Sequence, residues 1–387
     1  MKQHVKANVK VIFALTLVHF TGDFYSSFTS PLFPLFVDKM GLSLAQVGTI
    51  AGINRLLAFI VQPPVGYLSD QYQSRIFIFV GLLLPVIFIP LSGICTGFWT
   101  LLFAIMLGSI GSSMFHPSVT GMIPVYSGSK SGFSMSVFNT GGTLAFGIGP
   151  LFITWYADRF GLELLPFTML FGLCTGIYLY YSVPMPQPEG MKNLGFLKTI
   201  KQSLGSAWKV IILIWSVMFL RAVVGQSFLT FMPVFYVEKG FSIVSAGIIF
   251  SLFTIAGTIS GLASGLISDK IGIKPVFIFT HIIMTPILLL FLKLEGSWTY
   301  LGSILAGAAV LASLPLGVVM AQKLAPKGRS MVASLMMGLA YGLGGFAAPL
   351  VGKLADTYSI QTVLTGISFV PLLTLPIIYF FPNIKGD

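Results

Sequence analysis

The stretch VIFALTLVHFTGDFYSSFTSPLFPLF, residues 11–36, decides the fold class. It is apolar and long enough for a helix that crosses a bilayer, which takes about 20 residues. It also carries His19 and Asp23, which lie four residues apart and therefore share one helical face. A carboxylate in hydrocarbon costs roughly 2.5–3.5 kcal/mol on insertion scales, so we interpret Asp23 as part of a functional pathway.

The composition of the whole chain is that of a helical membrane protein. Of its 387 residues, 55% are hydrophobic and 9% charged, whereas an ordinary soluble domain has about 25% charged residues. The net charge of +11 does not indicate nucleic-acid binding, because the bases lie in short gaps between apolar runs. Cys95 and Cys174 each lie within an apolar run and form no disulfide or metal framework. The first apolar run exceeds a signal-peptide core, so we expect no cleaved signal.

Apolar runs predict twelve membrane spans in two groups of six. The expected fold is an all-α polytopic membrane protein with an N-terminal six-helix bundle (1–183), a cytoplasmic linker (184–208) and a C-terminal six-helix bundle (209–387). The linker is rich in proline at its start and in lysine after it. The predicted spans are 10–37, 43–68, 76–95, 98–125, 132–156, 162–183, 209–237, 242–267, 275–294, 297–322, 330–355 and 360–381.

The distribution of bases predicts that both termini are cytoplasmic. Basic residues accumulate in the cytoplasmic loops of membrane proteins. With the N-terminus inside, the cytoplasmic side holds Lys2, Lys6, Lys10, Arg75, Lys130, Lys192, Lys198, Lys201, Lys209, Lys270, Lys274, Lys323, Lys327, Arg329 and Lys385. The opposite side holds Lys39, Arg159, Lys239, Lys293 and Lys353.

An internal repeat relates the two groups of spans. One ungapped register aligns several residues of the first half with identical residues of the second. Two parallel six-helix halves are typical of large secondary transporters, whose substrate site lies between the halves near the bilayer midplane. The aligned pairs are Pro34 with Pro233, Gly41 with Gly240, Ser43 with Ser242, Gly48 with Gly247, Gly66 with Gly265, Ser69 with Ser268, Asp70 with Asp269, and Pro150 with Pro349.

The loop between the second and third spans carries a motif that the repeat duplicates. The copies run from Gly66 to Arg75 and from Gly265 to Lys274. Both resemble the G-x-L-[SA]-D-x-x-G-R-[RK] loop of the Major Facilitator Superfamily, although Gln73 and Ser74 depart from it in the first copy. Glycine permits close helix approach, and the aspartate at a helix end can pair with a base across the loop. We expect a conformational latch formed by Gly66, Asp70, Arg75, Gly265, Asp269 and Lys274.

A narrower resemblance extends over nearly the whole chain. The bacterial fosmidomycin-resistance branch of that superfamily is similar in several motifs, and this resemblance implies a proton-driven drug efflux antiporter with a role in antibiotic resistance. Ser118 stands where that branch has an acid, and Arg55 where it has a neutral amide. The similar motifs are His19-x-x-x-Asp23, Gln62-Pro63-x-Val65-Gly66-Tyr67, Gly111 through Pro117, Gly141-Gly142 with Gly149-Pro150, and Gly338 through Gly345.

Asp23 and Arg55 are predicted to lie at matched depth in the bilayer. Each is about 13 residues from the cytoplasmic end of its span, at ~1.5 Å per residue. One interpretation is a structural ion pair, since burying either charge alone is expensive. The other is a switch, in which an anionic substrate takes the arginine and Asp23 picks up a proton. His19 either relays that proton or simply forms a hydrogen bond within the bundle.

Other polar residues within the spans are candidate substrate ligands. Arg221 is the basic counterpart in the second half, and its planar fork of donors suits a carboxylate or phosphonate. The alternatives for Arg221 are bonds to backbone carbonyls or a pair with Asp23. His116, which precedes Pro117, and Asn139 are predicted at similar depth, where they line a cavity or pack structurally. Gln226 is a candidate of the same kind.

These residues predict a proton-coupled secondary transporter, most simply an exporter of small anionic or amphipathic compounds that works by alternating access. The alternative is a proton-coupled or exchange importer of an organic anion or metabolite. The sequence offers no nucleophile–base motif, nucleotide loop or metal cluster, so we expect no enzyme and no cofactor beyond a proton gradient. We further expect a monomer in the bacterial cytoplasmic (inner) membrane, with lipid, protons and a small-molecule substrate as partners and no nucleic acid.

Overall fold

The structure is a computed structural model that describes residues 8–71, 75–127, 131–184, 205–325, 336 and 340–384. Within these ranges all regular secondary structure is helical, as predicted. Eleven helical segments are long and apolar enough to cross a membrane, from Val9–Met40 to Ile360–Tyr379. The remaining predicted span, 330–355, lies partly outside the described residues. Its described portion forms the helices α15 (Ala340–Phe346) and α16 (Ala348–Tyr358).

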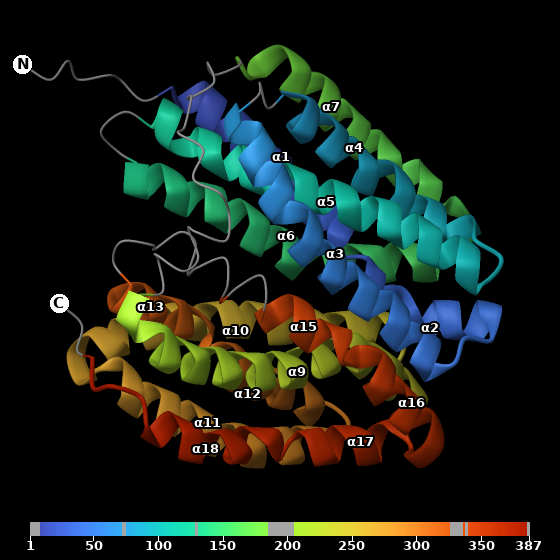
Figure 1. The fold of residues 1–387 in the computed structure, drawn as a ribbon. Helices are drawn as coiled ribbons and strands as arrows, with labels where there is room; N and C mark the ends of the chain where they lie inside the picture. The colour runs from blue at the N-terminus through green and yellow to red at the C-terminus, as the bar shows by residue number, and fades with distance from the viewer. Residues whose placement is uncertain are drawn as a thin grey trace, which may run out of the picture. The chain divides into compact units, whose positions relative to one another are not determined.

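The helices divide between two compact units, each of which is shown in Figure 1 as a set of helices running side by side. The N unit comprises the described residues of 1–41 and 57–192, and the C unit those of 42–56 and 193–387. Helices of the first half are α1 (Val9–Ser26), α2 (Thr29–Met40), α3 (Leu44–Gln71), α4 (Arg75–Leu91), α5 (Phe98–Tyr126), α6 (Ser131–Phe160) and α7 (Met169–Ser182). Those of the second half are α9 (Trp208–Glu238), α10 (Ile243–Ile271), α11 (Ile273–Lys293), α12 (Trp298–Leu311), α13 (Leu314–Leu324), α15, α16, α17 (Ile360–Ile367) and α18 (Val370–Tyr379).

The compact units differ from the predicted halves in their treatment of α3. The N-terminal part of this helix, up to Leu56, belongs to the C unit, and the rest belongs to the N unit. The reason is close packing on α16: a Cβ added to Gly352 would lie 2.9 Å from Cα of Ala45. The predicted linker lies largely in residues 185–204, outside the described ranges. The predicted domain boundaries therefore stay a prediction.

The internal repeat is visible as equivalent local structure in the two halves. Gly41 and Gly240 both have positive φ, at 63° and 89°, which is the backbone conformation that glycine adopts most readily. Ser43 and Ser242 then accept hydrogen bonds from backbone amides three residues later, at 3.2 and 3.1 Å. The repeated Gly-x-Ser sequence thus ends one helix and begins the next in each half.

Small residues allow the helices of the N unit to pack closely. Where α4 meets α5, a Cβ added to Gly81 would lie 2.7 Å from the backbone nitrogen of Phe115. A Cβ added to Gly111 would lie 2.8 Å from the carbonyl oxygen of Gly81. Glycine is therefore required on both sides of this contact, as is typical of membrane helix pairs. The contact fixes the part of α5 that carries His116.

Helix α1 is the central helix of the N unit and packs against α4, α5, α6 and α7. Its position is fixed by Tyr25, whose hydroxyl donates to the carbonyl oxygen of Thr168 and accepts from the amide of Gly172. Tyr25 is fully buried. Because the hydroxyl of Tyr25 both donates and accepts a hydrogen bond inside the unit, the position of α1 within the unit is fixed, and so are the positions of His19 and Asp23.

Candidate functional site

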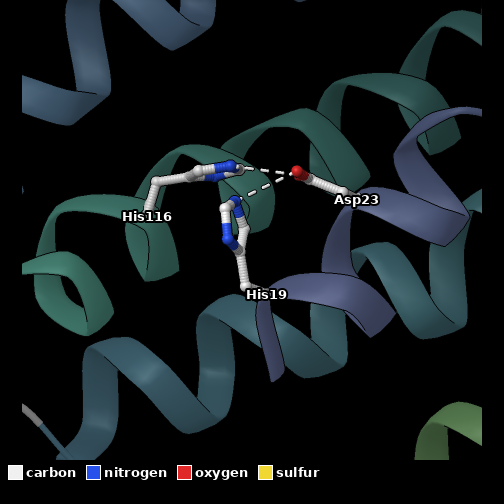
Figure 2. Close-up of side chains that lie close together, drawn as sticks. All are labelled: His19, Asp23 and His116. Carbon is white, nitrogen blue, oxygen red and sulfur yellow. Dashed lines mark ion pairs between the residues drawn. The ribbon is translucent and has the colours of Figure 1, made fainter. Parts of the chain in front are cut away.

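Asp23 lies between two histidines inside the N unit (Figure 2). Its Oδ2 is 3.1 Å from Nε2 of His19, and its Oδ1 is 3.0 Å from Nε2 of His116. Asp23 is 4% exposed and His19 8% exposed, whereas the side chain of His116 is partly accessible. We call these three residues the Asp23 cluster. Both oxygens of a buried carboxylate therefore face an imidazole nitrogen.

The local geometry of two helices produces this arrangement. His19 and Asp23 are four residues apart on α1, so their side chains meet on one face of the helix. His116 reaches the same carboxylate from α5, which packs against α1. The two sequence motifs that contain these residues are thus combined in one site.

The second nitrogen of each ring is held by a backbone carbonyl. Nδ1 of His19 is 2.9 Å from the carbonyl oxygen of Phe138 on α6. Nδ1 of His116 is 2.6 Å from the carbonyl oxygen of Ser112 on its own helix. A carbonyl oxygen can only accept, so each Nδ1 carries the hydrogen of its contact. Both rings are therefore held with Nε2 directed at Asp23.

Aromatic side chains stack on both imidazoles. The His19 ring stacks on Phe138 with centroids 4.1 Å apart and an interplanar angle of 21°. The His116 ring stacks on Phe115 at 4.2 Å and 26°. The two imidazoles themselves meet edge to face at 5.2 Å. These contacts restrict the rotation of the rings and keep the cluster in one geometry.

Glycine at position 142 makes room for the cluster. A Cβ added to Gly142 would lie 2.6 Å from Oδ2 of Asp23 and 2.6 Å from Nε2 of His19. Any larger residue at this position would therefore displace both side chains. Of the Gly141-Gly142 pair of the sequence motif, Gly142 therefore borders the site, whereas a Cβ added to Gly141 would meet Thr16.

Two imidazoles and one carboxylate are also a donor set that transition metals accept. The candidate ligand atoms of His19, Asp23 and His116 all lie within 4.8 Å of one another. Each Nε2, however, faces a different carboxylate oxygen at hydrogen-bond distance, which is the arrangement of shared protons. The predictions of no metal and no cofactor stay predictions.

The predicted arginines both belong to the C unit. Arg221 is 2% exposed on α9, and its Nη2 donates to the carbonyl oxygen of Val310 on α12 at 2.9 Å. This is one of the alternatives that the sequence left open. Arg55 lies on α3, and a Cβ added to Gly345 would be 2.6 Å from its Cβ and Cγ. Asp23 belongs to the N unit, so a pair between Asp23 and either arginine stays a prediction.

The remaining candidate ligands occupy different environments. Gln226 is buried on α9, five residues beyond Arg221. Asn139 is exposed on α6, next to the Phe138 whose carbonyl holds His19. His116, predicted as a substrate ligand, is in direct contact with the carboxylate predicted for proton coupling, and its role as a substrate ligand stays a prediction.

The predicted latch is only partly within the described residues. Residues 72–74 lie outside them, and so do the side chains of Asp70 and Arg75. In the second copy, Nζ of Lys274 donates to the carbonyl oxygen of Tyr379 at 2.7 Å rather than to the exposed Asp269. Among the described atoms, none lies within 4 Å of a Cβ added to Gly265. The latch therefore stays a prediction.

A contact that the sequence did not predict lies within the C unit, at the beginning of α3. The carboxylate of Asp356 on α16 accepts hydrogen bonds from the amides of Leu44, at 2.7 Å, and Ala45, at 2.9 Å. These amides have no partner within their own helix, and a negative charge is favourable at a helix N-terminus. Asp356 therefore caps α3 from a position more than 300 residues later in the sequence.

The fold and the Asp23 cluster define a polytopic helical membrane protein with an ionisable site inside one bundle. The chain belongs to the Major Facilitator Superfamily, whose model matches residues 15–349. The protein is therefore a multi-pass membrane transporter rather than an enzyme. The resemblance found in the loop motifs is confirmed.

Relatives and solved structures agree with this family. The chain is 27% identical to the fosmidomycin resistance protein of Escherichia coli over 385 residues, 97% of this chain and 94% of that protein. It is 28% identical over 309 residues to the multidrug resistance protein MdtG of Proteus mirabilis, 75% of each chain. A bacterial homologue of the human lysosomal transporter Spinster superimposes with a TM-score of 0.81 at 14% identity, covering 98% of this chain and 97% of that one.

Proposed function

We propose that this transporter is an antiporter that exports small anionic or amphipathic compounds in exchange for protons. The observation that carries the proposal is the buried carboxylate of Asp23 held between two imidazoles. Ionisable groups within membrane spans are expensive and mark proton relays or substrate pathways. An imidazole changes its charge near neutral pH, so it is suited to exchange protons with both sides of a membrane.

The identity of the substrate is proposed from the relatives and from the arginines. Proteins named for fosmidomycin resistance and multidrug resistance are similar to this chain, which supports export of drug-like compounds. Arg55 and Arg221 supply fixed positive charge in the C unit, and an arginine fork binds a carboxylate or phosphonate in two-point contacts. The guanidinium of Arg221 has five N–H donors, and one of those on Nη2 donates to the carbonyl of Val310.

The remaining features of the proposal follow from the class of transporter and from the topology. The transporter works by alternating access, takes its energy from a proton gradient without a cofactor, and functions as a monomer. It lies in the cytoplasmic (inner) membrane of a bacterium with both termini in the cytoplasm, which is the orientation that the positive-inside distribution favours.

Proton flux in proteoliposomes tests the proposal. The purified protein is reconstituted with a pH-sensitive dye inside the vesicles, and compounds are added in three groups: anionic, including fosmidomycin, neutral and cationic. We expect proton movement opposite to the movement of anionic compounds. Proton movement in the same direction as substrate would instead indicate a proton-coupled importer, and no proton movement with any transported compound would refute proton coupling.

A comparison of Asp23→Asn with a control substitution outside the cluster tests the role of Asp23 in proton coupling. Asp23→Asn should abolish gradient-driven flux but retain exchange of substrate against substrate, because exchange needs no net proton transfer. Asp38→Asn is the control, since Asp38 is an exposed carboxylate near the end of α2. Unchanged driven flux in Asp23→Asn would contradict the assigned role.

A further inference from the structure

The Asp23 cluster contains four short contacts between a nitrogen and an oxygen. The two Nδ1 atoms face the carbonyl oxygens of Phe138 and Ser112, and the two Nε2 atoms face the carboxylate oxygens of Asp23. All four distances lie between 2.6 and 3.1 Å. A contact of this length is favourable only with a hydrogen between the atoms, because two lone pairs would otherwise face each other. The observed geometry therefore needs four hydrogens.

Counting these hydrogens gives the charge of the cluster. Two neutral imidazoles and an ionised carboxylate carry two hydrogens, both of which the Nδ1 contacts use. Each Nε2···O contact needs one more, held by an imidazolium or, for one of them, by a protonated Asp23. With both present the cluster carries a charge of +1, and with both removed it carries −1. The two Nε2···O contacts are thus two separate positions for a transferable proton.

We propose that the Asp23 cluster binds two transferable protons, one through His19 and one through His116, so that one transport cycle exchanges two protons. This inference rests on the proposed function and adds to it the number of protons and a second proton carrier. His116 binds one transferable proton, as His19 does, and its ring is the more accessible of the two. It is therefore the ring that connects the buried carboxylate with its surroundings.

A change of tautomer does not remove the need for the extra hydrogens. If His19 moved its hydrogen from Nδ1 to Nε2, the contact with Asp23 would be satisfied, but Nδ1 would then face the carbonyl of Phe138 without a hydrogen. Turning the ring away is opposed by its stacking on Phe138 and by the close backbone of Gly142. The same reasoning holds for His116, which is stacked on Phe115 and bonded to Ser112.

Other ionisable groups near the cluster are few. Of the helices packed on α1, α4 has no ionisable side chain after Arg75 at its start, and α7 has only a thiol and tyrosines. Helix α5 adds Tyr126, which donates to the carbonyl of Pro184. Helix α6 carries Tyr156, Asp158 and Arg159, which lie fourteen to seventeen residues beyond Gly142, about 21–26 Å along the helix. Within the described residues of these helices, His116 is the ionisable side chain that faces Asp23.

Nitrogen NMR of the histidines tests the proton count without a substrate. The chain has four histidines, so ¹⁵N-histidine labelling gives a simple spectrum, provided that the purification tag contains none. His19→Gln and His116→Gln assign the two signals, and EDTA keeps metal ions away from the nitrogens. At low pH we expect one of two results. Either both rings carry hydrogen on both nitrogens, or one ring does and the infrared spectrum shows the band of a protonated carboxyl, which Asp23→Asn abolishes. We expect both protons to leave as the pH rises. The inference would be overturned if Nε2 of His116 stays unprotonated over the whole pH range in which His19 gains or loses its proton, with no band of a protonated carboxyl.

The proton-to-substrate ratio provides a second test that separates the inference from the proposed function. In proteoliposomes, the membrane potential that stops flux at a fixed pH gradient gives the ratio for a transported compound such as fosmidomycin. We expect two protons in the native protein and one in His116→Gln, because glutamine can donate to Asp23 but cannot carry a proton. One proton in the native protein would overturn the inference and leave the proposed antiport intact. No proton movement with a transported compound would refute the antiport itself.

Discussion

Replacement of Gly142 by alanine should uncouple the transporter without removing any ionisable group. The added Cβ would lie 2.6 Å from Oδ2 of Asp23 and from Nε2 of His19, whereas ordinary van der Waals contact begins at 3.4 Å. Both side chains must therefore move by about 0.8 Å, and shifts in opposite directions lengthen the 3.1 Å contact between them to as much as ~4.7 Å, beyond hydrogen bonding.

The energetic effect of Gly142→Ala follows from the loss of this contact. A hydrogen bond to a charged group contributes about 1.5–3 kcal/mol, so its loss shifts the balance between the closed and the opened cluster by about 10- to 150-fold. The helix itself should be slightly more stable, since alanine is favoured over glycine by about 1 kcal/mol within a helix. We therefore expect correct folding together with a loss of coupling.

Proton-driven flux in proteoliposomes measures the effect of Gly142→Ala. We expect a decrease of at least ~10-fold, with substrate exchange retained. Gly121→Ala on α5 is the control, because no described atom lies within 4 Å of a Cβ added there. Driven flux equal to that of the native protein in Gly142→Ala would refute the reasoning, since the cluster could not then depend on its observed geometry.

Three further predictions concern the C unit and the position of α1. Asp356→Ala should weaken the docking of the beginning of α3 by about 1 kcal/mol, which is measured as faster hydrogen exchange of the Leu44 amide. Asp356→Asn should weaken the docking less, because the amide oxygen can still accept a hydrogen bond. An unchanged exchange rate in both variants would contradict the cap. Arg221→Ala should weaken the binding of fosmidomycin far more than that of a neutral transported compound, and equal losses would count against an anion site. Tyr25→Phe should lower the free energy of unfolding in mild detergent by about 1–3 kcal/mol, because the amide of Gly172 loses its buried acceptor; no change in that free energy would show that water replaces the hydroxyl.

The helices and their number were predictable because membrane insertion depends on local properties of the sequence. An apolar run of about 20 residues must form a helix in hydrocarbon, where unpaired backbone groups are too costly. Eleven of the twelve predicted spans accordingly have a counterpart among the described residues. The functional interpretation of Asp23 came from the same argument, since the free-energy cost of a carboxylate in hydrocarbon can be judged from its depth in the predicted span.

The contact between His116 and Asp23 could be anticipated only in part from the sequence. Its distance from the cytoplasmic end of the predicted span 98–125 equals that of His19 from the start of the span 10–37, which places both imidazoles at the same depth. Depth alone does not give the helix neighbours, however, and the close packing of α1 with α5 is a tertiary contact. The cap of α3 by Asp356 is likewise a tertiary contact that the local sequence does not predict, because the two partners are far apart in the chain.

The sequence by itself determined the fold class, the family and the position of Asp23 near the middle of a predicted span, because each of these follows from composition, hydropathy or short motifs. Only the tertiary structure decided that Asp23 faces two imidazoles within the N unit, that backbone carbonyls hold both rings, and that Gly142 leaves room for them. The physical reason is that a hydrogen bond depends on tenths of an ångström. Those distances are set by the packing of α1 against α5 and α6, which the sequence pattern of a single helix does not contain.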